Sequence, residues 1–196
     1  AMSEVAASGS SAHRFVGMVG APRGSGRREL RLPSSAMSDA PHRNVSRVIE
    51  AGAAIGVDVR PIRFPEGTRT AAEAASAIGC DVGQIVKSLI FAVDGEVVLA
   101  YVSGANQLDE TKLAIAAGGA VCSRVDADTV RSTTGFPIGG VPPFGHDTDV
   151  RVFVDPDLMA HDTVWAAAGT WHDVFSLTPE QLVEVSGGTV IEIGRS

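Results

Sequence analysis

A chain of 196 residues, 44% of them hydrophobic, is long enough for one α/β core and short for two enzymatic domains. It has no run of roughly 18 apolar residues for a membrane span, and Cys80 and Cys122 lack zinc-ligand spacing and fit a reducing cytosol. Residues 1–40 carry five arginines and three acids, so the net charge of −7 for the whole chain corresponds to −9 for residues 41–196. Such an acidic domain is unsuited to bind long duplex DNA or RNA, because that binding requires many Lys and Arg contacts with phosphates.

Residues 1–40 are rich in Gly, Ser, Ala and Arg and show no sustained hydrophobic period, which predicts a flexible extension. Its apolar stretch "RFVGMVG" is interrupted by glycines and makes a poor signal-peptide core. Met37 is an alternative start and Ala1 before Met2 is typical of a cloning scar, so whether this extension is native stays open. We expect the folded domain to comprise residues 41–196.

From residue 44 onward, the apolar residues follow helical and strand periods in turn. Helical spacing, N-cap residues and terminal glycines predict helices or helical turns over 44–56, 68–79, 108–119, 126–135 and 178–188. Strands are predicted over 57–64, 84–93, 96–104, 120–125, 150–155, 163–169, 172–177 and 189–194.

Two local patterns within these elements are specific. Thr70 and Glu73 have the spacing of a capping box, in which a hydroxyl and a carboxylate satisfy the first amides of a helix. Asp94 and Gly95 supply the positive φ of a type I′ turn between two β-rich runs. The mixture of hairpins and helices predicts an α+β fold with a mixed, mainly antiparallel central sheet flanked by helices, and argues against a doubly wound parallel sheet.

Lys87 stands out in the stretch "QIVKSLIFAV", which otherwise has the composition of a buried strand. Only Lys87 and Lys112 are lysines among the 16 basic residues of the chain. Both faces of the predicted strand are largely apolar, so the Lys87 ammonium either reaches a cleft or extends along the strand to water. In a cleft it is suited to bind a carbonyl, a phosphate or a ribose hydroxyl, whereas at an exposed strand start it has no function.

The segment "GFPIGGVPPFG", residues 135–145, has four glycines and three prolines. This composition predicts a stiff loop without regular structure, whose amides can approach a ligand closely; the alternative is an ordinary rigid connector. No GxxxxGK[ST] motif is present, so it is not a phosphate-binding P-loop.

Other residues that could carry chemistry give weaker patterns. The histidines His146, His161 and His172 lack metal-ligand spacing, and His172 either faces a cleft or has a structural role. No GxSxG elbow supports a serine nucleophile. Asp155 and Asp157 flank Pro156 and are interpreted as turn formers.

Several segments together resemble, in order and spacing, the YbaK/prolyl-tRNA synthetase-associated editing domain family over roughly residues 42–193. These segments are "GTRTAAEAASAIG", "GQIVKSLIF", "LDETKLAIAAGG", "STTGFPIGGVPPFG", "VFVDPDLM" and "AAGTWHDVFSLTPEQL". The resemblance implies a YbaK-like fold and a free-standing, cytoplasmic trans-editing deacylase without a cofactor. The implied substrate is the 3′ CCA end of mischarged tRNA, for example tRNA(Pro) carrying Cys or Ala. Prolyl-tRNA synthetase or an elongation factor would assist, and neither DNA nor a membrane is an implied partner.

The resemblance also assigns site residues by position. Lys87 matches the required lysine that holds the 3′ end of the substrate, and Gly139 and Gly140 open the GxxxP loop that is expected to act in catalysis. Substrate-binding positions are expected at Ser88, Val141, Pro142, Pro143, Phe144, His172 and Thr70. His172 matches a histidine of the alanine-specific branches, across a variable turn.

Hydrolysis of an activated ester needs a positioned water and hydrogen-bond donors for the carbonyl, and no protein nucleophile. We expect Lys87 to anchor the terminal phosphate or ribose, with Arg63 and Arg69 adding positive charge. Loop amides would stabilise the oxyanion, and the substrate 2′-hydroxyl or His172 would activate the water; a cysteinyl substrate can also be attacked by its own thiol. Two alternatives stay open: a non-catalytic binding module recognising a nucleotide, an aminoacyl end or a synthetase, and a lysine Schiff-base enzyme.

Overall fold

A computed structural model describes residues 42–64 and 70–195. The predicted extension over 1–40 and the side chain of Arg69 lie outside these residues. The helices are α1 (Arg43–Ala54), α2 (Ala71–Ile78), α3 (Glu110–Ala116), α4 (Ala127–Thr134) and α5 (Pro179–Ser186), with 3₁₀ turns over Val82–Gln84 and Pro156–Ala160. None of the helices described is long and apolar enough to cross a membrane.

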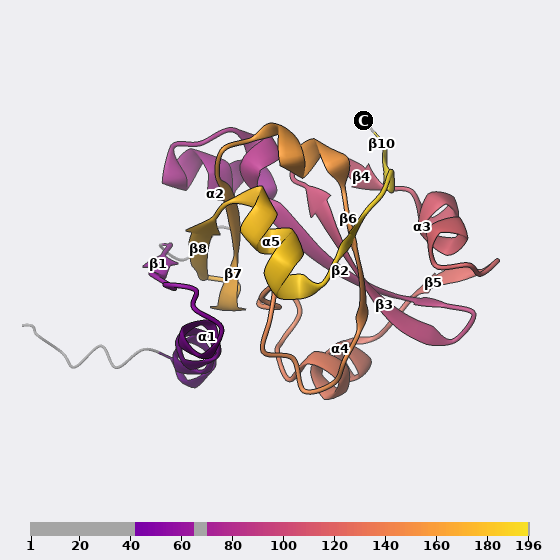
Figure 1. Cartoon of the computed structure of the whole chain (residues 1–196), viewed down its shortest axis with the longest axis horizontal. Helices are drawn as coiled ribbons and strands as arrows, with labels where there is room; N and C mark the ends of the chain where they lie inside the picture. Colours follow the sequence, from indigo (N-terminus) through magenta and orange to yellow (C-terminus); the bar gives the residue numbers. More distant parts are fainter. Residues whose placement is uncertain (1–41, 65–69, 196) are drawn as a thin grey trace, which may run out of the picture. The chain divides into compact units, whose positions relative to one another are not determined.

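The strands form a central five-stranded sheet and two smaller sheets (Figure 1). The central sheet has the order β5-β2-β3-β6-β9, in which β5, β2 and β3 pair antiparallel while β6 and β9 are added in parallel. The second sheet has the order β1-β8-β7, and β4 pairs with β10. The α+β fold with a mixed sheet is therefore confirmed. The strand bounds are β1 (Ile62–Arg63), β2 (Val86–Val93), β3 (Glu96–Ser103), β4 (Gln107–Leu108), β5 (Cys122–Arg124), β6 (Arg151–Val154), β7 (Val164–Thr170), β8 (Asp173–Leu177), β9 (Thr189–Val190) and β10 (Gly194–Arg195).

The local patterns in the sequence form as predicted. Thr70 Oγ1 accepts the Glu73 amide and the Glu73 carboxylate accepts the Thr70 amide, which completes the capping box of α2. Asp94 and Gly95 have φ values of 49° and 91°, so the turn of the β2–β3 hairpin has the positive φ angles expected. These interactions depend on residues close together in the chain, which is why the sequence alone predicts them.

The strand predicted over 57–64 is wrong in extent. Only Ile62–Arg63 pairs with β8. Val57 and Val59 are buried as the alternation requires, but this stretch joins no sheet, and Pro61, just before β1, has no N–H to donate to a ladder.

The strand predicted over 189–194 is divided in two. Thr189–Val190 pairs with β6 in the central sheet and Gly194–Arg195 pairs with β4. Between them the chain passes from one sheet to the other, and Ile193 is fully buried on the way.

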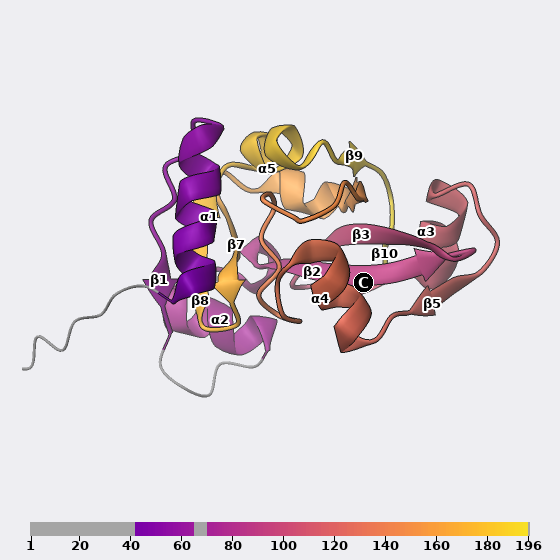
Figure 2. The same ribbon diagram turned by 90° about the horizontal axis from the view of Figure 1, so that it is seen from below.

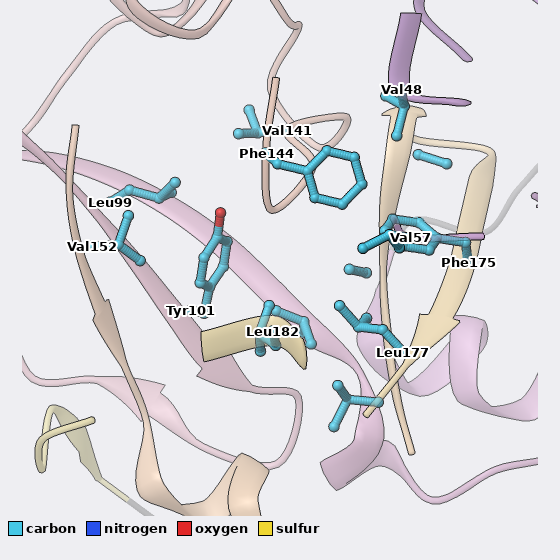
Figure 3. Packing of buried hydrophobic residues seen from close by; sticks show 14 of the residues in the cluster. Val48, Val57, Leu99, Tyr101, Val141, Phe144, Val152, Phe175, Leu177 and Leu182 are labelled. Carbon is cyan, nitrogen blue, oxygen red and sulfur yellow. The ribbon is translucent and has the colours of Figure 1, made fainter. Parts of the chain in front are cut away.

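Two hydrophobic clusters fill the two faces of the central sheet. One face packs against α3 through residues such as Val98, Val102 and Leu113. The other face packs against α5, α1 and the second sheet, and α1 lies alongside β7 (Figure 2). Phe144, from the 135–145 loop, enters this cluster and meets Phe175 of β8 edge-on with ring centroids 5.8 Å apart (Figure 3). The loop is thus held between the two sheets.

Candidate functional site

A cavity of about 540 Å³ lies where β2, the start of α2, the 135–145 loop and the β7–β8 hairpin meet. Its walls are largely apolar, and Phe64, Trp165 and Val174 contribute to them. Polar groups come from four residues that the sequence nominated, namely Lys87, Ser88, Thr70 and Gly139. The structure therefore brings these four residues together although they come from three separate segments of the chain.

The cavity follows the outer edge of β2. Strand β5 pairs only with Phe91–Val93, and Ile85 bridges to Trp165 of β7. Between these two pairings, no other strand in the described part of the chain covers the outer edge of residues 87–90. Lys87, Ser88 and Leu89 line the cavity at this gap in the sheet.

Lys87 is held at the cavity by a polar network behind β2. Its Nζ donates to the backbone carbonyl of Asn106. The Asn106 side-chain amide donates to Asp155 Oδ2 at 2.9 Å and to Asp157 Oδ2 at 2.6 Å. Burial lowers the pKa of the Lys87 ammonium, and the negative charge of Asp155 acts in the opposite direction. The network occupies one N–H donor of the Lys87 ammonium and leaves the other two for other partners.

Sequence patterns missed this network. Asp155 does form the predicted turn, because its Oδ1 accepts the Asp157 amide at 3.1 Å. Asp155 is also only 1% exposed and accepts the Ser103 amide on β3. Asn106 belongs to no local pattern, and its role arises from hydrogen bonds with residues 19 to 51 positions away in the chain.

The second half of the 135–145 loop is anchored and buried. Ser88 Oγ donates to the Val141 carbonyl at 2.8 Å, and the Tyr101 hydroxyl donates to the Pro142 carbonyl at 3.2 Å. His146 Nε2 also lies 2.7 Å from the Pro142 carbonyl. Four residues predicted to contact substrate are buried here and do not line the cavity, so that role stays a prediction for Val141, Pro142, Pro143 and Phe144.

Gly139 and Gly140 differ in what they offer. Gly139 is exposed, lines the cavity and has a φ of +78°, a conformation that favours glycine. Gly140 is buried, and its amide donates to the Pro137 carbonyl at 2.9 Å. Pro142 and Pro143 have no N–H. Ile138 and Gly139 are therefore the loop residues that line the cavity, and both have a backbone N–H.

The turn between β7 and β8 presents Trp171 at the cavity, with 58% of its surface exposed. His172 does not line the cavity, and its buried Nδ1 has no hydrogen-bond partner among the described residues. Its predicted interaction with substrate stays a prediction. Both tryptophans of the chain, Trp165 and Trp171, line the cavity, and sequence patterns nominated neither. Among the described residues, no group of three or more His, Cys, Asp or Glu side chains could hold a metal ion.

Arg63, expected from the sequence to add positive charge near Lys87, is joined to Asp173. Its Nε and Nη2 donate to the two carboxylate oxygens of Asp173, each at 3.0 Å, and the Thr170 hydroxyl donates to the same carboxylate. Burial raises the pKa of Asp173, but these hydrogen bonds and the Arg63 charge outweigh it and hold the pKa below its ordinary value. The arrangement braces the turn that carries Trp171.

Comparisons with known proteins show to which family the chain belongs. The family model described as the aminoacyl-tRNA editing domain matches residues 65–185. A crystal structure provisionally described as a trans-editing enzyme for prolyl-tRNA synthetase superposes with a TM-score of 0.76 and 39% identity, over 80% of this chain and 100% of that chain. The uncharacterized protein YwhH of Bacillus subtilis is 32% identical over 63% of this chain and 78% of its own length. A proline–tRNA ligase of Maridesulfovibrio salexigens is 34% identical over 55% of this chain, which is 18% of the ligase. The chain therefore belongs to the aminoacyl-tRNA editing domain family.

Proposed function

We propose that the protein is a trans-acting deacylase that hydrolyses the ester of mischarged tRNA, with tRNA(Pro) carrying cysteine or alanine as its substrate. The observation that carries this proposal is the convergence of Lys87, Ser88, Thr70 and Gly139 on one apolar cavity. The names of the prolyl-tRNA-related relatives support the choice of tRNA. The mainly apolar wall of the cavity suits an uncharged side chain on the attached amino acid, such as that of alanine or cysteine, better than a charged one.

Each polar residue keeps a group for the substrate. Lys87 has ammonium donors beyond the one given to Asn106, which suit the ribose or phosphate of the terminal adenosine. Thr70 Oγ1 accepts the Glu73 amide at 3.2 Å, so its own O–H remains available to donate to substrate. Because Ser88 Oγ donates to the Val141 carbonyl, its contribution to the substrate is as an acceptor.

The proposed reaction uses these groups without a protein nucleophile. A water oxygen attacks the ester carbonyl carbon, and amides at Ile138 and Gly139 stabilise the developing oxyanion. The bond from that carbon to the 3′ oxygen breaks, the 3′ oxygen takes up a proton, and free amino acid and tRNA are released. Because His172 is not among the residues that line the cavity, we favour the substrate 2′-hydroxyl over His172 for activating the water.

The proposal predicts that Lys87→Ala lowers the rate of deacylation by about 100-fold or more, because the 3′ end of the substrate loses the contact that positions its ester against the loop. Initial rates are measured with alanyl-, cysteinyl-, seryl- and threonyl-tRNA on proline and other tRNA bodies. Lys112→Ala is the matched control, because Lys112 is the other lysine and does not line the cavity; its Nζ donates to Glu192 Oε1 at 3.0 Å and to the Gly194 carbonyl at 2.7 Å. Thermal melts of both variants establish that they are folded.

A Lys87→Ala variant that hydrolyses mischarged tRNA at the normal rate contradicts the proposed role of this residue. Tight binding of the tRNAs by the unmodified protein without hydrolysis of any of them would instead indicate a non-catalytic binding module. A tRNA other than tRNA(Pro), or an amino acid other than cysteine or alanine, would correct the substrate while leaving the reaction intact.

A further inference from the structure

A second groove lies beside the first cavity, with a volume of about 540 Å³. It shares Lys87, Ser88, Leu89 and Ile138 with the cavity, so the two hollows meet along the uncovered edge of β2. The groove extends from this junction toward Arg124 of β5 and Arg195 of β10. Any ligand that reaches the cavity and continues beyond Lys87 has this groove available to it.

The groove is positively charged although the body of the chain is acidic. Its lining includes the three cations Lys87, Arg124 and Arg195, and Glu110 is the acid among its lining residues. Arg124 Nε lies 4.0 Å from Glu110 Oε1, and 86% of the Arg124 side chain is exposed. Arg195 Nη2 donates to Gln107 Oε1 at 3.1 Å. Each guanidinium has five N–H donors, so both arginines keep donors that can bind an anion in the groove.

We propose that this groove binds the phosphates of the single-stranded nucleotides that precede the terminal adenosine of tRNA, while the first cavity holds the aminoacylated adenosine. The inference rests on the proposed function and deepens it by naming the residues that select the acceptor end. Lys87 lies at the junction, where the terminal phosphate would pass from one hollow to the other. A single strand needs only such local positive charge, which agrees with the acidic body of the domain.

The groove suits this ligand better than the other hollow that adjoins the cavity. That hollow has a volume of about 250 Å³ and is lined by Arg131, Ile138 and Trp171 among others. It is smaller than the roughly 300 Å³ at which pockets for drug-sized molecules begin, and a nucleotide is of that size. It also has a single cation and does not include Lys87.

The test compares Arg124→Ala, Arg195→Ala and the double variant with Arg131→Ala, an arginine of the smaller hollow that serves as the matched control. Substrates are alanyl- or cysteinyl-tRNA(Pro) and the corresponding aminoacyl-adenosine ester, which has no preceding phosphates. We expect KM for the tRNA to rise about five-fold for each groove arginine, with kcat unchanged. The aminoacyl-adenosine should show no change, and the salt dependence of KM should weaken by about 0.7 in log–log slope for each phosphate that is no longer neutralised.

Fluorescence anisotropy with an RNA microhelix that ends in CCA and carries no amino acid measures the affinity of the protein for the acceptor end without hydrolysis. Weaker binding by the Arg124/Arg195 variants, but not by Arg131→Ala, supports the groove even if no tRNA is deacylated, so failure of the proposed function is recognised separately. Unchanged KM, microhelix affinity and salt dependence in the double variant overturn the inference. An equal loss of affinity in Arg131→Ala also overturns it. If an alanine variant melts abnormally, the glutamine substitution at the same position, Arg124→Gln, Arg195→Gln or Arg131→Gln, replaces it.

Discussion

Asp173 is a residue whose charge supports the site from outside the cavity. Only 4% of its surface is exposed, and its carboxylate accepts hydrogen bonds from Arg63 and Thr170. A buried carboxylate is stable only when its oxygens are paired in this way. Because Asp173 begins β8 directly after Trp171 and His172, its hydrogen bonds determine the shape of the turn at the cavity.

We expect Asp173→Asn to lower the free energy of unfolding by about 1–2 kcal/mol at pH 7, because the amide loses the charge-assisted bonds to Arg63 and Thr170. The pKa of Asp173 is lowered in the folded protein, so its ionised form stabilises the fold at pH values above the pKa of about 3.9 that Asp has in the unfolded chain. That contribution is lost as the pH falls through the folded pKa. Urea unfolding should therefore show a larger difference in the free energy of unfolding between Asp173→Asn and the parent at pH 7 than below pH 4. An equal difference in that free energy at both pH values contradicts this account.

Residues of the site differ in how far the sequence could predict them. Thr70 follows from a capping box of four consecutive residues, and Lys87 from its contrast with an apolar strand. Asn106 and Trp171 could not be predicted, because nothing near them in the chain shows that they meet β2 or the cavity. The functional role of Lys87 could be predicted only from the family resemblance, which depends on the 135–145 loop as well as on the strand.

At the scale of elements, strand edges and the loop decide where the site forms. Hairpins, caps and turns were predictable because their hydrogen bonds are local, as in α2 and in the β2–β3 turn. Strand lengths were not: β9 ends with its partner β6, whereas β1 begins only after Pro61 although its partner β8 continues to Leu177. The length of β5 also matters for function, because this short strand leaves the outer edge of residues 87–90 uncovered, and the cavity forms there.

Close packing of the loop against the β7–β8 hairpin gives an element-scale prediction. A Cβ at Gly140 would lie 2.8 Å from the Gly169 carbonyl oxygen, which is backbone and cannot turn away. We expect Gly140→Ala to cost about 2–3 kcal/mol of unfolding free energy, as overpacking does. It should also lower deacylation, because the loop and the Trp171 turn are pushed apart. Calorimetry and initial rates provide the measurements.

Gly118→Ala is the control for that variant. Gly118 has a φ of +76° and a Cβ there would meet nothing within 4 Å, so its substitution reports the cost of a left-handed backbone alone, about 1 kcal/mol. It lies at the end of α3, away from the cavity lining, so deacylation should be unaffected. A Gly140→Ala variant no less stable than Gly118→Ala, with normal activity, would show that the loop has room to move.

At the scale of the whole domain, the site depends on α1 although α1 does not line the cavity. Arg47 Nη2 donates to the Gly145 carbonyl at 2.5 Å and to Asp147 at 2.7 Å, and its guanidinium lies 4.4 Å from the centroid of the Phe136 ring. These interactions hold both ends of the 135–145 loop. The fully buried Val48, also on α1, belongs to the cluster that joins the two sheets. One helix thus connects the core with the loop that bears Gly139.

This arrangement predicts where the chain can be shortened. The first buried hydrophobic residue of the described chain is Val45, so deleting residues 1–40 removes nothing from the described core and should leave the melting temperature and kcat/KM of deacylation unchanged. Deleting residues 1–56 removes α1 with Val48 and Arg47, at a cost comparable to the roughly 5–15 kcal/mol that stabilise a typical domain, so this shorter chain should not fold. Calorimetry and deacylation of both truncated chains make the comparison. If the 1–40 deletion melts normally yet loses activity only on full-length tRNA, the deleted segment contributes to tRNA binding; if it melts earlier, the folded domain begins before residue 41.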